Sequence, residues 1–212
     1  MNRRIVVGLI LAWMGFAAIH AQDFEHAFQE VQEAFEVRSA NAQQSLKAYL
    51  ADYPYTPYVD EVYTMQGILL TEQKQYKPAV QTMAKVDVKQ LSRKMIPLYN
   101  FHMGYAYFQL GEESKALTYL QRLKKKDNPY ALQATYYVGC CYYNQREYGK
   151  ALVEFLTLEQ NGGYQQIAPY YIVQIYYAQG EYDRVLERAE VLLADYPKND
   201  YNDELHRIAG EI

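Results

Sequence analysis

The sequence repeats itself at a nearly constant interval. The segment Leu-Ala-Asp-Tyr-Pro stands at residues 50–54 and again at residues 193–197. Between the two copies, four apolar residues follow one another at steps of 37, 35 and 34 residues: Gly67, Gly104, Gly139 and Val173. A second small or apolar residue follows each of them by twelve positions: Ala79, Ala116, Ala151 and Val185. A repeat of this length predicts stacked supersecondary units, each of which buries its apolar face against its neighbours.

The paired small residues indicate how each unit folds. Two helices that cross closely need little side-chain bulk at the crossing, and glycine opposite alanine meets that need. Gly111 and Gly180 stand between the two expected helices of their units, where glycine ends a helix. This pattern resembles the tetratricopeptide repeat, a helix–turn–helix unit of about 34 residues. The resemblance covers about residues 42–212 and implies an all-α fold, a right-handed superhelical solenoid of antiparallel helix pairs.

The repeat pattern divides the chain into four parts. They are a signal peptide at residues 1–21, an N-terminal helical pair at 22–58 that caps the array, four repeats within 59–199, and a half repeat at 200–212. The repeats cover about 60–96, 97–131, 132–165 and 166–199. The half repeat lacks a second helix. Either the chain is a truncated form of a longer array, which we favour, or Leu205, Ile208 and Ile212 pack on the preceding unit.

The first 21 residues have the three parts of a secretory signal. Arg3 and Arg4 precede an uncharged apolar run at residues 5–18, and the segment ends at Ala21. That run is shorter than the ~20 residues a spanning helix needs, although an uncleaved anchor is the alternative. Cleavage would remove two of 21 basic residues and none of the 25 acidic ones, changing the net charge from −4 to −6. We therefore expect an exported, periplasmic protein with no transmembrane segment after cleavage and no nucleic-acid partner.

Residue types that carry catalysis are scattered along the chain. Of the four histidines, His20 belongs to the signal peptide and the other three lie far apart in the repeat register. Cys140 and Cys141 are adjacent, so on a helix they point about 100° apart and do not share a ligand easily. The sequence has neither a Gly-x-Ser-x-Gly elbow nor a phosphate-binding loop. We expect no enzyme, no catalytic residue, no metal site and no cofactor.

Tyrosine is unusually frequent, with 24 among 212 residues. The family resemblance implies that the first helix of each repeat lines a concave groove. Carried over to this sequence, it implies a partner-binding groove of nine residues: Phe101, Tyr105, Phe108, Tyr136, Tyr143, Asn144, Tyr170, Gln174 and Tyr177. The resemblance makes Tyr107, Tyr142 and Tyr176 core residues instead. The alternative for any ring of the groove is that it only packs one helix on the next.

These features favour an exported scaffold that binds a peptide segment or a helix of another protein. Tyrosine combines a large apolar face with a hydroxyl group, which suits such a groove. The stretch from Ala51 to Glu61 is similar to linkers in the repeat domains of envelope-assembly and division accessory proteins. That similarity implies envelope complexes as partners and a role in envelope assembly or maintenance. The alternative is a module that binds cell-wall glycans, because sugars also stack on aromatic rings.

Overall fold

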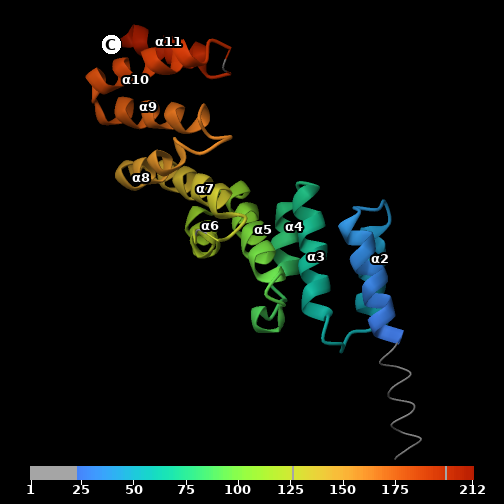
Figure 1. The fold of residues 1–212 in the computed structure, drawn as a ribbon. Coiled ribbons are helices and arrows are strands. Elements are labelled where there is room, and N and C mark those ends of the chain that lie inside the picture. Colours follow the sequence, from blue (N-terminus) through green and yellow to red (C-terminus); the bar gives the residue numbers. More distant parts are fainter. Residues whose placement is uncertain (1–22, 126, 199) are drawn as a thin grey trace, which may run out of the picture. The chain divides into compact units, whose positions relative to one another are not determined.

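The structure is a computed structural model that describes residues 23–125, 127–198 and 200–212. The signal peptide expected at residues 1–21 lies outside the described residues. All regular elements of the described residues are helical (Figure 1). Residues 23–36 are helical and precede the labelled elements. These are α2 (Ala42–Asp52), α3 (Val59–Glu72), α4 (Tyr76–Met83), η1 (Val88–Gln90), α5 (Met95–Gln109), α6 (Glu113–Leu120), η2 (Gln121–Leu123), α7 (Ala131–Asn144), α8 (Tyr148–Leu158), α9 (Ile167–Gln179), α10 (Tyr182–Asp195) and α11 (Asn202–Glu211).

The helices form consecutive pairs, as the repeat pattern predicts. In the four expected repeats, the first helices are α3, α5, α7 and α9, and the second helices are α4, α6, α8 and α10. Each pair turns through one residue with a left-handed backbone, at φ of 60° for Lys74, 71° for Gly111, 60° for Arg146 and 73° for Gly180. Glycine was expected at only two of these turns. In every turn the next residue's N–H donates to a carbonyl five residues back, for example from Glu112 to Tyr107, which satisfies the helix end.

Close crossings of the two helices confirm the role of the small residues. A Cβ atom on Gly67 would lie 2.2 Å from Met83 Cγ, and one on Gly104 would lie 2.6 Å from Leu120 Cγ. One on Gly139 would lie 3.0 Å from the Phe155 ring. The matching residues on the second helices are fully buried: Ala79, Ala116, Ala151 and Val185. The pairing therefore depends on the missing side chains.

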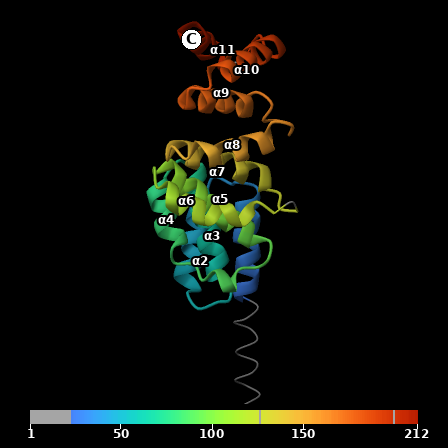
Figure 2. The ribbon, with the colours of Figure 1, turned by 90° about the vertical axis from the view of Figure 1, so that its left-hand side faces the viewer.

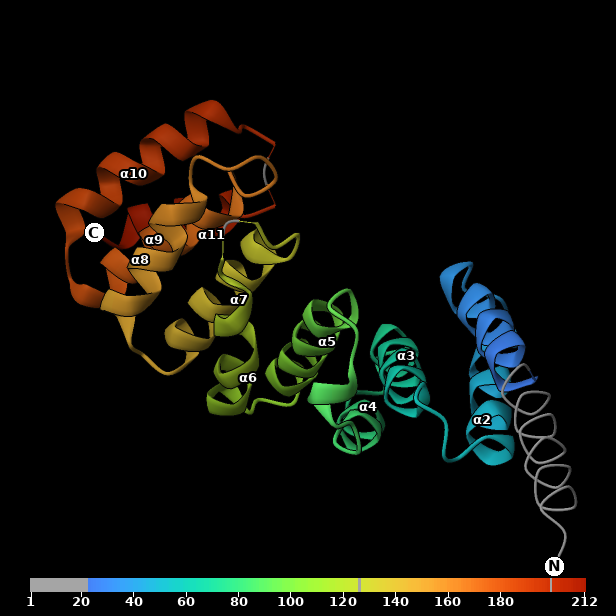
Figure 3. The same ribbon diagram turned by 60° about the horizontal axis from the view of Figure 1, so that its bottom comes forward.

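The chain forms two compact units, the first ending at Leu98 and the second covering Tyr99–Ile212. In the first unit, α3 lies against both α2 and α4 (Figure 3). Arg38 donates two hydrogen bonds, of 2.9 and 2.8 Å, to the Glu72 carboxylate of α3. The N–H of Asp87 donates to Asp60 at 2.7 Å, which holds the long connection after α4 against the start of α3. The right-handed superhelical sense of the array stays a prediction.

In the second unit each helix packs on the next, from α6 to α11 (Figure 2). The helix α11 occupies the half repeat and packs against α10. Leu205 and Ile208 are fully buried and join the core formed by α8, α9 and α10, whereas Ile212 is 44% exposed. The half repeat thus buries its apolar face on the preceding repeat. Among the described residues, no helix is both long enough and apolar enough to cross a bilayer.

Candidate binding surface

The predicted groove residues belong to α5, α7 and α9 of the second unit. All seven rings are half-buried, so they both pack within the protein and reach solvent. We call these seven the tyrosine face: Phe101, Tyr105, Phe108, Tyr136, Tyr143, Tyr170 and Tyr177. Gln174 is also half-buried, whereas Asn144 is exposed and donates a 3.3 Å hydrogen bond to Glu113 at the start of α6. Asn144 therefore lies at the edge of this surface.

Tyr137 joins the rings of α5 to α7. Its ring centroid lies 6.2 Å from that of Phe101, 5.0 Å from that of Tyr105 and 5.2 Å from that of Phe108. Burial raises the pKa of the Tyr137 hydroxyl, and the neighbouring Tyr105 adds to the rise. Three rings of the tyrosine face thus surround one tyrosine that the sequence analysis did not place in the groove.

Tyr171 has the same role between α7 and α9. Its ring stacks on the buried Phe155 at 4.5 Å and lies 6.1 Å from Tyr136 and 5.4 Å from Tyr143. Burial also raises the pKa of the Tyr171 hydroxyl. Tyr137 and Tyr171 occupy the same position of successive repeats, two residues before Gly139 and Val173. That shared register was the signal in the sequence that could have identified them.

A third set of contacts starts from the helix at residues 23–36, from α5, from α7 and from α9. Each contact reaches a tyrosine that stands shortly before the first helix of the following pair. We call these contacts the junction pairs: Phe28–Tyr58 at 4.0 Å, Phe101–Tyr130 at 4.8 Å, Tyr136–Tyr164 at 5.7 Å and Tyr170–Tyr201 at 4.3 Å. Offset aromatic pairs of this kind add about 0.5–1.5 kcal/mol beyond the area they bury. Part of the tyrosine excess therefore serves to join repeats, as the packing alternative proposed.

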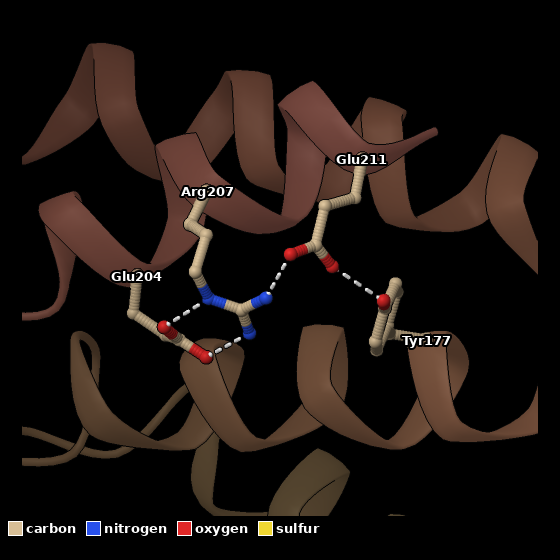
Figure 4. A network of polar contacts seen from close by, with 4 residues as sticks. All are labelled: Tyr177, Glu204, Arg207 and Glu211. Atoms are coloured by element: carbon tan, nitrogen blue, oxygen red, sulfur yellow. Dashed lines mark hydrogen bonds and ion pairs between the residues drawn. The ribbon is translucent and has the colours of Figure 1, made fainter.

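At the end of α9, a polar network connects the tyrosine face to α11 (Figure 4). The Tyr177 hydroxyl donates a 2.6 Å hydrogen bond to Glu211. Arg207 donates to Glu204 at 2.8 and 2.6 Å and also pairs with Glu211. Since Tyr170 stacks on Tyr201, the α9 part of the face is partly covered by the chain itself.

Comparison with known proteins agrees with this geometry. Residues 100–127, which include most of α5 and all of α6, match the family model of the tetratricopeptide repeat. The chain has the fold of a tetratricopeptide repeat protein. It is similar to the crystal structure of a tetratricopeptide repeat protein from Parabacteroides merdae, with 21% identity, a TM-score of 0.67, and coverage of 90% of this chain and 75% of that one.

A second solved structure extends the comparison. PilF from Pseudomonas aeruginosa is 18% identical, with a TM-score of 0.55, and the match covers 92% of this chain and 94% of that one. No curated protein matches the sequence. Tetratricopeptide repeats are typically non-catalytic scaffolds. Within the described residues, no group of three or more His, Cys, Asp or Glu side chains gathers where it could hold a metal ion.

The cysteine pair of α7 belongs to the core of the second unit. Cys140 is 3% exposed and Cys141 is fully buried, and both are free thiols. Burial raises the pKa of Cys140 to about 11 and that of Cys141 to about 12, because the low-dielectric interior disfavours a thiolate. Hydrogen bonds from Tyr136 and Tyr171 oppose part of the rise at Cys140.

These shifts predict a loss of stability in alkali. The raised pKa values mean that the folded state holds the two protons more tightly, so their contribution is complete below about pH 8.5 and falls as the pH rises toward 11. The loss approaches ~1.4 kcal/mol per pH unit for each thiol. Urea unfolding of the reduced protein between pH 8 and pH 10 checks this. A Cys140→Ala/Cys141→Ala variant should lose less stability over this range, because it keeps only the loss from buried tyrosines with raised pKa values, such as Tyr137 and Tyr171. Equal slopes in both proteins would contradict the prediction.

Proposed function

We propose that this protein is an exported scaffold that binds a peptide segment or a helix of another protein across the tyrosine face. The observation that carries the proposal is the continuous set of half-buried rings on α5, α7 and α9 of the second unit. The sequence of residues 1–21 supports export, and the linker-like stretch between α2 and α3 supports a role in envelope assembly or maintenance. The scaffold character of tetratricopeptide repeats agrees with a protein partner.

The packing of the face makes it suitable for binding. Tyr137, Tyr171 and the junction pairs fix the rings in position, so a partner would order few side chains on this surface. Since each immobilised side chain costs about 0.5–1.5 kcal/mol on association, a surface ordered in advance keeps more of its contact energy. The exposed amides of Gln109 and Gln133 lie on the same first helices and offer hydrogen bonds to a backbone. This combination suits an extended segment better than a small molecule.

Substitution of Tyr105 tests the proposal. Short peptides selected from a random library for binding to the purified protein should bind Tyr105→Ala at least about tenfold more weakly, because an aromatic anchor is lost. Tyr119→Ala is the matched control. Tyr119 is also a half-buried ring, but it belongs to the second helix α6, where it stacks on Tyr107 at 5.7 Å. Its loss should leave the peptide affinity within about twofold. Equal losses in both variants would place the binding surface elsewhere.

A further inference from the structure

A pocket opens beside the tyrosine face, between the α8–α9 connection and the start of α11. Its volume is about 440 Å³. Three tyrosine rings, two amides and one carboxylate line it: Tyr136, Tyr164, Tyr201, Gln165, Gln166 and Asp200. The pocket is within the size range of ligand sites, about 300–1,000 Å³. Because Tyr136 also belongs to the tyrosine face, a segment bound there could extend into this pocket.

The pocket lies between two consecutive junction pairs. Tyr136 and Tyr164 form one pair, and Tyr201 belongs to the next through its stack on Tyr170. Gly163 also lines the pocket, and its φ of 89° is a conformation that disfavours residues with a side chain. A Cβ atom at Gly163 would meet nothing within 4 Å, so the space beside it is open. The pocket thus combines open space beside the backbone with rings that already pack on other rings.

The pocket carries a negative charge. Asp200 is the one charged residue among the described residues that line it. Burial raises the pKa of Tyr201, and the negative charge of Asp200 adds to the rise. Arg207 of α11 does not line the pocket and is engaged by Glu204 and Glu211. The exposed Lys198 is not among the lining residues.

Elsewhere in the second unit, a basic side chain lies over a tyrosine ring and pairs with a neighbouring carboxylate. Lys115 lies 5.2 Å from the centre of the Tyr107 ring and pairs with Glu112. The same arrangement recurs in the next two repeats. It consists of Lys150 over Tyr142 with Glu147, and of Arg184 over Tyr176 with Glu181. The attraction of a cation to an aromatic face and to a carboxylate accounts for all three.

We propose that this pocket receives a basic side chain, arginine in preference to lysine, from the segment bound on the tyrosine face. Asp200 would pair with the cation while the rings of Tyr164 and Tyr201 contact it. Arginine is preferred because its planar group stacks on rings and pairs with a carboxylate through two hydrogen bonds. This proposal rests on the proposed function, and it adds the chemistry of one position in the partner.

Peptide selection on the purified protein tests the proposal. We expect the selected short peptides to share one arginine or lysine. Replacement of that arginine by citrulline, which has a similar shape but no charge, should weaken binding about tenfold. Asp200→Asn should weaken the arginine peptide similarly and leave the citrulline peptide unchanged. Asp203→Asn is the matched control, because Asp203 is an exposed acid in the first turn of α11 and does not line the pocket.

The outcomes separate the two proposals. Selected peptides without a shared basic residue, or equal affinity for the arginine and citrulline forms, would overturn the pocket assignment and leave the scaffold function standing. N-acetylglucosamine oligosaccharides could also displace a bound peptide. If Asp200→Asn abolishes that displacement, the pocket binds a glycan, and the assignment of a basic side chain is overturned. If the selection yields no peptide that binds the protein, the scaffold function fails and the pocket proposal fails with it.

Discussion

Gly104→Val is expected to lower the free energy of unfolding of the second unit by about 3 kcal/mol. The added Cβ would lie 2.6 and 2.8 Å from two carbon atoms of Leu120 and 3.3 Å from the carbonyl oxygen of Ala116. Leu120 is fully buried, so it cannot move away without disturbing its own neighbours. The two methyl groups of valine add further overlap. The better helix propensity of valine offsets only a few tenths of a kcal/mol.

Urea unfolding followed by far-ultraviolet circular dichroism measures this effect. Gly149→Ala is the control, because Gly149 lies in α8 and a Cβ there would meet nothing within 4 Å. That change should raise stability by up to about 1 kcal/mol, since alanine favours the helix. An unchanged unfolding midpoint for Gly104→Val would show that α5 and α6 do not cross as closely as the structure indicates.

Much of the fold could be predicted from the spacing of single residues. Gly67, Gly104 and Gly139 each recur with a small partner twelve residues later, and a crossing of two helices follows from that distance along one chain. The turns were predicted only where glycine marks them. Lys74 and Arg146 adopt the same left-handed backbone without glycine, because the surrounding helix pair holds the turn and the strain is small enough to be offset.

The proposed binding surface was less predictable, because it depends on which rings meet across successive helix pairs. The family pattern places Tyr136 and Tyr143 on a groove but does not identify Tyr171 as the ring that contacts both. The junction pairs combine residues about 30 positions apart, such as Tyr170 and Tyr201, and no local periodicity relates them. The partial covering of Tyr177 by α11 depends on Glu211, whose partner cannot be identified from helix spacing alone.

Phe155→Ala is expected to cost about 3–5 kcal/mol of stability. Phe155 is fully buried in α8, and its ring stacks on Tyr171 at 4.5 Å. Removal of the ring would leave a cavity and would release Tyr171, which contacts Tyr136 and Tyr143 of the tyrosine face. Peptide affinity should therefore fall together with stability. Leu156→Ala is the control, because Leu156 is the next residue of α8 and is 39% exposed, so its loss should cost about 1 kcal/mol or less.

Combining Phe155→Ala with Gly139→Ala tests how closely α7 and α8 cross. A Cβ atom at Gly139 would lie 3.0 and 3.1 Å from two atoms of the Phe155 ring and 3.2 Å from Glu154 Cβ. Gly139→Ala alone should therefore change stability little, because crowding offsets a gain of about 1 kcal/mol in helix propensity. In the Phe155→Ala background most of the crowding is gone, so the same change should recover about 1 kcal/mol or more. Chemical denaturation of the unaltered protein, the two single variants and the double variant gives the coupling energy, which should favour the double variant by about 1 kcal/mol. A coupling near zero would mean that the two residues do not meet, and that the absence of a side chain at Gly139 serves something other than the approach of α7 to α8.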